Sequence, residues 1–165
     1  MAGSDPERLG SLARLVIGLG VLLVLAGIAV HGITVGTFAR IWHDLVERPD
    51  GPMAFRCILQ PAMAAIAAVH DGLKDARGGN RPFVETMLRD PTKRAARLRE
   101  GLNATARILL LGLVMDGLYQ TFVLRRFYPS EAVIVALLLA LLPYVILRGL
   151  ITRAARRRLA AQRVQ

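Results

Sequence analysis

Five polar residues interrupt otherwise apolar stretches of this sequence, and their side chains are the ones that could do chemistry there. They are His31, Arg56, Gln60, Asp116 and Gln120. A carboxylate at the centre of a membrane-spanning helix costs about 2.5–3.5 kcal/mol on insertion scales. Asp116 must therefore face protein or water, and the sequence predicts a polar site inside a bundle of apolar helices.

The spacing of these residues predicts that they share one face of each helix. One stripe recurs at three- and four-residue spacing and contains Arg56, Gln60, Ala64, Ala67 and Asp71. A second stripe contains Thr105, Gly112, Asp116 and Gln120. At a rise of about 1.5 Å per residue, the polar members fall at similar depths. The five residues are expected to form one cluster in the outer half of the bundle.

Two hypotheses explain such a cluster. In the structural one, Asp116 and Arg56 form a buried ion pair, surrounded by glutamine hydrogen bonds, that fixes the register of the helices. In the functional one, desolvation favours the neutral acid, and Asp116 binds a proton or cation in a small transporter or channel. A neighbouring arginine favours a permanently ionised carboxylate and counts against a proton carrier.

The composition places these stripes in a membrane. The 165-residue chain is 54% hydrophobic, has a mean hydropathy of +0.44, and carries a net charge of +10 with its arginines beside the apolar runs. About 20 apolar residues suffice for a helix to cross the bilayer. Four segments are predicted to do so, at residues 15–39, 53–70, 108–124 and 132–151. The fold class is therefore all-α, an integral membrane bundle of four transmembrane helices in a single domain.

The second segment is ambiguous by hydropathy, because Arg56, Gln60 and Pro61 interrupt it. The distribution of charge decides in its favour. With four spans, sixteen basic residues lie on the side of the two termini and four on the opposite side. Basic residues remain on the cytoplasmic side, so both termini are expected to be cytoplasmic.

The predicted cytoplasmic parts are a loop at 71–107 and a basic tail at 152–165. Within the loop, residues 82–89 can form a short helix, and Asp90 before Pro91 is typical of the start of a helix that runs on into the membrane. Phe83, Val84, Met87 and Leu88 either dip into the membrane interface or belong to a solvated linker.

The first span also carries a helix-packing motif. Gly32 and Gly36 are four residues apart, and small residues at this spacing allow two helices to approach closely. A signal peptide is the alternative for this segment, but its apolar run is longer than the usual core of about 7–15 residues.

No cofactor, metal site or enzymatic activity is expected. The three histidines lie at different predicted depths, which disfavours a haem held between two of them, and no nucleophile triad or phosphate loop is present. Cys57 is expected to be a small packing residue. The basic tail has no interleaved aromatic residues, so nucleic acid is not an expected partner. The expected partners are a bilayer with anionic headgroups, other membrane proteins and a second copy of the chain.

One stretch resembles a known group of proteins. Tyr119 and Gln120, together with the segment from Arg125 to Gly149, RRFYPSEAVIVALLLALLPYVILRG, resemble an uncharacterised family of small multi-pass bacterial inner-membrane proteins. The resemblance covers roughly the C-terminal half. It implies an inner-membrane location and no activity or catalytic residue. The resulting expectation is an accessory or scaffold component of the inner membrane, with a proton- or cation-coupled carrier as the alternative.

Overall fold

The computed structural model describes residues 9–31, 54–122, 125 and 127–162. In these ranges the chain forms five helices and no strand, which confirms the all-α class. The helices are α1 (Ser11–His31), α3 (Ala54–Arg77), α4 (Phe83–Arg89), α5 (Pro91–Phe122) and α6 (Pro129–Gln162).

Three of these helices, α1, α5 and α6, contain stretches long and apolar enough to cross a membrane. Helix α3 is not among them, because polar residues interrupt its apolar run and its last turns are charged. Large apolar side chains remain exposed along the helices, with Leu22, Ile58 and Phe122 all more than 60% exposed. Contact of such side chains with water is unfavourable, whereas contact with lipid is not. The fold is therefore compatible with a membrane protein.

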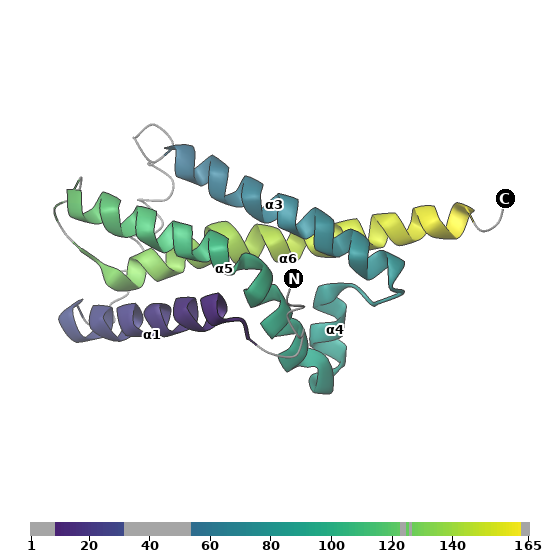
Figure 1. The fold of residues 1–165 in the computed structure, drawn as a ribbon, viewed down its shortest axis with the longest axis horizontal. Helices are drawn as coiled ribbons and strands as arrows, with labels where there is room; N and C mark the ends of the chain where they lie inside the picture. The colour runs from purple at the N-terminus through teal and green to yellow at the C-terminus, as the bar shows by residue number, and fades with distance from the viewer. Residues whose placement is uncertain (1–8, 32–53, 123–124, 126, 163–165) are drawn as a thin grey trace.

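Alternating chain directions organise the bundle. Helices α1 and α5 run one way and α3 and α6 the other, so that α5 starts toward the side at which α3 ends, while α6 continues beyond both (Figure 1). Helices α5 and α6 form the middle, with α3 packed on one side and α1 on the other. We call the end where α3 and α6 finish, together with α4 and the start of α5, the basic end.

The segment predicted as a cytoplasmic loop at 71–107 is built largely of helix. Helix α3 continues through Arg77, α4 follows, and α5 begins at Pro91. The carboxylate of Asp90 accepts a hydrogen bond of 3.2 Å from the backbone nitrogen of Thr92, as the predicted helix start requires. Helix α4 and the first part of α5 lie across the axis of the bundle before α5 turns into it (Figure 1). Helix α6 likewise continues through the predicted tail to Gln162.

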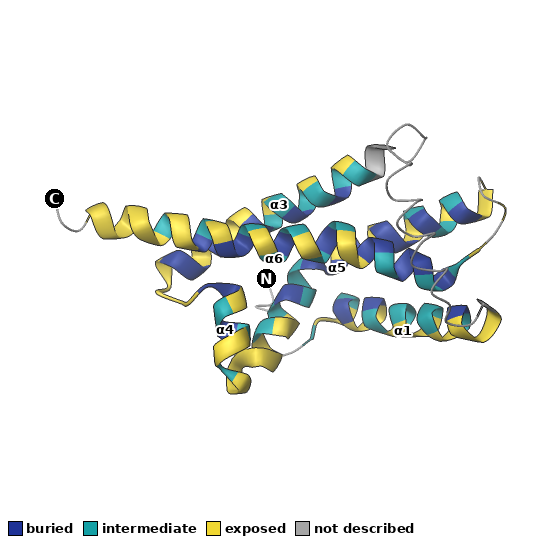
Figure 2. Cartoon of the chain, turned by 180° about the vertical axis from the view of Figure 1, so that it is seen from behind, coloured by how far each residue is buried: buried dark blue, intermediate teal, exposed yellow. Residues whose placement is uncertain are grey.

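Small side chains make the contact between α3 and α6, the most extensive in the bundle. The buried residues there include Ala64 and Ala68 of α3 and Ala136 and Ala140 of α6. Alanine lets two helix backbones approach closely, which compensates for the absence of a hydrophobic driving force between helices in lipid. The outward faces of the same helices are exposed, as Figure 2 shows.

Gly27 marks a second close approach, between α1 and the start of α6. A Cβ atom at Gly27 would lie 2.7 Å from Cβ of Ser130 and 2.8 Å from its backbone nitrogen, which cannot move as a side chain can. Gly18 of the same helix has nothing within 4 Å of the corresponding position. Glycine is therefore required at one position of α1 and not at the other.

We expect Gly27→Ala to lower the free energy of unfolding by about 1–3 kcal/mol, because the added methyl group overpacks the contact with α6. Gly18→Ala is the matched control and should gain about 0.5–1 kcal/mol from helix propensity. Thermal unfolding in mild detergent, followed by circular dichroism, measures both. Equal midpoints for the two variants would mean that α1 does not dock on α6 at this point.

Candidate functional site

Asp116 lies in the interior of the bundle with none of its surface exposed. Gln120, one turn later on α5, donates a hydrogen bond of 2.7 Å from Nε2 to Oδ2 of Asp116. The Oε1 atom of Gln120 accepts a bond of 2.6 Å from the backbone nitrogen of Tyr128. The glutamine thus connects the buried carboxylate to the turn that precedes α6.

Gln60 enters the bundle from α3 at nearly the same level. It is 2% exposed, and its Nε2 donates a hydrogen bond of 3.1 Å to the carbonyl oxygen of Ala136. The amide lies against Gly112, where a Cβ atom would meet the whole amide group of Gln60 within 3 Å. Gly112 is one turn before Asp116, so α5 holds the carboxylate and the contact with Gln60 on one face.

The other members of the predicted cluster are less fully placed. His31 is the last residue of α1 and Arg56 lies in the first turn of α3, but their side chains are outside the described part of the structure. Gly32 and Gly36 also lie outside the described residues. The ion pair between Arg56 and Asp116 and the glycine packing face therefore remain predictions.

A second and larger polar site lies toward the basic end and is centred on Arg148 of α6. The side chain of Arg148 is completely buried. Its Nε donates a hydrogen bond of 2.8 Å to Oδ2 of Asp75, and its Nη2 donates one of 2.6 Å to Oε1 of Glu100. Its Nη1 donates one of 2.7 Å to the hydroxyl oxygen of Tyr144. All three nitrogens of the guanidinium group are therefore engaged.

Three further contacts complete this site. Tyr144 passes the polar chain onward by donating a hydrogen bond of 2.6 Å to Oδ2 of Asp71. Arg97 of α5 contacts Asp75 and Glu100 with the same nitrogen, Nη1, at 2.9 Å each. We call the six residues the Arg148 network: Asp71, Asp75, Arg97, Glu100, Tyr144 and Arg148.

Helix α4 covers the Arg148 network with an aromatic ring. Phe83 is 2% exposed, and the guanidinium carbon of Arg148 lies 4.7 Å from the centre of its ring. The ring of Tyr144 meets Phe83 edge to face at a centroid distance of 6.3 Å. Phe83 therefore neither dips into the membrane interface nor belongs to a solvated linker. Its ring covers the buried guanidinium group of Arg148 and makes a cation–π contact with it.

The Arg148 network was not foreseen from the sequence. The predicted spans place Arg148 within a helix end, outside the count of basic residues on either side, and assign Asp75, Arg97 and Glu100 to the loop at 71–107. A usable signal was present, because Asp71 and Asp75 are spaced by four residues, as are Tyr144 and Arg148. Side chains at this spacing face the same way on a helix. A prediction that α3 continues beyond residue 70 would have placed Asp71 and Asp75 on the helix that packs beside Tyr144 and Arg148.

The Arg148 network can hold helices together through ion pairs. It joins α3, α5 and α6 through two guanidinium groups and three carboxylates, so that each buried charge has a partner of opposite sign. In the part of the chain that the structure describes, no group of three or more histidine, cysteine, aspartate or glutamate residues is arranged to hold a metal ion. The geometry suits the fixing of helices relative to one another.

An apolar cavity of about 310 Å³ lies on the other side of the bundle, between α1, α5 and α6. Leucine, valine and isoleucine side chains line most of it, among them Val16, Leu109 and Val133. It carries no group that could act on a substrate.

The chain matches no known protein family, no curated protein and no solved structure.

Proposed function

We propose that the chain is a small four-span protein of the bacterial inner membrane that acts as an accessory or scaffold component, without enzymatic activity. The observation that carries this proposal is the fully engaged guanidinium group of Arg148, which fastens three helices together. Buried ionic groups of this kind serve to fix one arrangement of helices among otherwise similar apolar surfaces. A rigid arrangement is what a protein needs in order to present a constant surface to a partner.

The directions of the helices support four spans with both termini in the cytoplasm. Helix α3 lies along α6, antiparallel to α5, although its own hydropathy falls short of the other long helices (Figure 1). The polar face of α3 is turned inward, as buried Gln60 and Asp75 show, while Ile58 and Ile66 are exposed. A span that hides its polar residues against neighbouring helices can be less apolar than one surrounded by lipid.

Fusions to a reporter that is active only in the cytoplasm test this topology. A reporter after Gln165 should be active, and one inserted near Pro49, which is outside the described residues, should be inactive. A second reporter that is active only outside the cytoplasm should give the opposite pattern. Cytoplasmic activity at Pro49 would contradict the four-span arrangement.

Affinity purification in mild detergent then tests the accessory role. Identification of one stable co-purifying membrane protein would support a scaffold, whereas a homogeneous oligomer of this chain alone would favour the carrier. The carrier remains the second candidate because the carboxylate of Asp116 is completely buried inside a candidate span. A buried intramembrane carboxylate is a functional hypothesis in its own right.

A further inference from the structure

A polar cavity of about 370 Å³ lies at the basic end, between the turn after α3, helix α4 and the first turns of α5. Its lining carries four basic side chains and one acidic side chain: Arg81, Arg89, Lys93 and Arg97, with Asp90. We propose that this cavity binds the phosphate group of an anionic ligand, either the headgroup of a membrane phospholipid or a soluble phosphate. The lipid source rests on the proposed membrane function, whereas the phosphate site does not.

Three chain segments bring the basic groups together. Lys93 and Arg97 are one turn apart on α5 and therefore share a face. Arg89 comes from the end of α4, and Arg81 comes from the turn after α3, which Gly79 makes possible with a φ of 69°. Arginine matches phosphate oxygens through two parallel hydrogen bonds, and lysine adds a compact charge.

One basic side chain of the cavity is held firmly by carboxylates, whereas two others have weaker carboxylate partners that a ligand can replace. Arg97 is held by Asp75 and Glu100 at 2.9 Å each, so this member of the Arg148 network forms a fixed side of the cavity. The pairs of Arg89 with Glu85 and of Lys93 with Asp90 are longer, at 3.5 Å, and both cations are about 70% exposed. Exposed ion pairs of this kind contribute little to stability, because water and salt screen them. A phosphate can therefore displace their carboxylates.

The carboxylate in the cavity does not close it to anions. A hydrogen bond of 2.5 Å from the hydroxyl group of Thr92 lowers the pKa of Asp90, which keeps this group ionised and occupied at the start of α5. Asp90 keeps its negative charge, but the four basic side chains of the lining outnumber it, so a net positive charge remains. Such a net charge attracts phosphate at physiological pH.

The setting of the cavity favours a lipid as the source of the phosphate. Helix α4 lies across the bundle axis, so it runs along the membrane surface when the long helices span the bilayer (Figure 1). Its Leu88 is 71% exposed and its Val84 is 37% exposed, and apolar side chains of this kind enter the interface between headgroups and acyl chains. The cavity beside them would then lie at the level of the headgroup phosphates.

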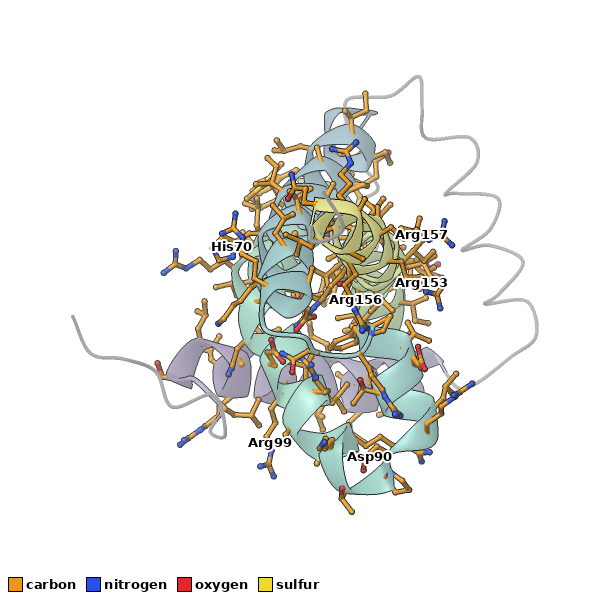
Figure 3. The ribbon with its side chains drawn as sticks, turned by 90° about the vertical axis from the view of Figure 1, so that its right-hand side faces the viewer. His70, Asp90, Arg99, Arg153, Arg156 and Arg157 are labelled. Atoms are coloured by element: carbon orange, nitrogen blue, oxygen red, sulfur yellow. The ribbon has the colours of Figure 1, made fainter. Side chains whose placement is uncertain are left out.

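A pair of double variants tests the site in the full-length protein. Arg81→Gln with Lys93→Gln removes two charges from the cavity, while Arg156→Gln with Arg157→Gln removes two exposed charges from α6 (Figure 3). Arg97 is left unchanged because it belongs to the Arg148 network. The unfolding midpoint is measured in nonionic detergent against increasing dioctanoyl phosphatidylglycerol, dioctanoyl phosphatidylcholine or inorganic phosphate. Circular dichroism confirms that each variant is folded.

We expect phosphatidylglycerol to raise the midpoint of the wild type and of the α6 control variant saturably. The cavity variant should need about tenfold more lipid, because it loses charge-assisted hydrogen bonds to phosphate. Phosphatidylcholine should act more weakly, since its positive choline opposes the basic lining. Stabilisation by inorganic phosphate that depends on the cavity residues and competes with the lipid would support a phosphate site with a soluble ligand.

Two results would overturn the phosphate site. One is an equal loss in the cavity and α6 variants, which would indicate only a general attraction to basic charge. The other is no loss in either variant. The topology fusions test the proposed function independently. The activity of a reporter fused after Gln165 or near Pro49 depends on the side of the membrane and not on phosphate binding.

Discussion

Replacing Arg148 by methionine should lower the free energy of unfolding by about 3–5 kcal/mol, the usual loss when one partner of a buried ion pair is removed. Asp75 and Glu100 would lose their contacts of 2.8 and 2.6 Å with the guanidinium group, and Tyr144 would lose a donor. Arg97 alone would then remain as the cation beside Asp75 and Glu100. Denaturation in mixed detergent micelles, followed by circular dichroism, measures the loss.

Three further variants identify the cause of this loss. Arg148→Lys keeps the charge but cannot place three nitrogens against three different groups, so an intermediate loss is expected. Asp75→Asn combined with Arg148→Met restores the balance of charge in the Arg148 network and should recover part of the stability. Arg153→Met, at an exposed position of α6, should change it by less than about 0.5 kcal/mol. A similarly small effect of Arg148→Met would show that the Arg148 network does not hold the helices.

Replacing Asp116 by asparagine separates the scaffold from the carrier. If Asp116 is ionised and paired with Arg56, the variant leaves an unmatched buried arginine and loses about 3–5 kcal/mol. The double change Arg56→Met with Asp116→Leu should then recover most of the loss. The hydrogen bond from Gln120 does not explain such a loss, because the oxygen of an asparagine can still accept it.

The carrier predicts the opposite behaviour of the same variant. Asparagine resembles the neutral carboxylic acid, so the fold should be retained while proton- or cation-coupled flux in reconstituted vesicles disappears. Thr121→Val, an exposed change on the same helix, is the control for nonspecific effects on reconstitution. A stable but flux-inactive asparagine variant would contradict the scaffold. An unstable variant that the double change restores would contradict the carrier.

The positions of the helices were largely readable from local sequence. Pro91 and Pro129 stand at the first residues of α5 and α6, where proline lacks the amide hydrogen that would in any case have no partner. Apolar runs predicted four spans, and three of them coincide with helices that are candidate spans. The spacing of Gly112, Asp116 and Gln120 predicted an inward face, and the structure shows Asp116 and Gln120 buried. These features depend on residues within a few turns of each other.

The Arg148 network depended on distances that the sequence does not contain. Asp75 and Arg148 are 73 residues apart, and Glu100 lies between them on another helix. Each of these charges, considered alone, is consistent with a helix end that is exposed to water. The positive-inside rule accounts for basic residues at such an end. Only the packing of α3 along α6 shows that these charges are removed from water together.

The sequence by itself determined that this chain forms apolar helices, where most of them begin, and that a carboxylate lies inside one of them, because periodicity and helix-start signals act locally. The tertiary structure decided which charges became buried partners and which remained exposed. Arg148 and Arg153 are five residues apart on one helix, yet the first is completely buried and the second exposed. Their difference arises from Asp75, Glu100 and Phe83, which only the folded chain brings to Arg148.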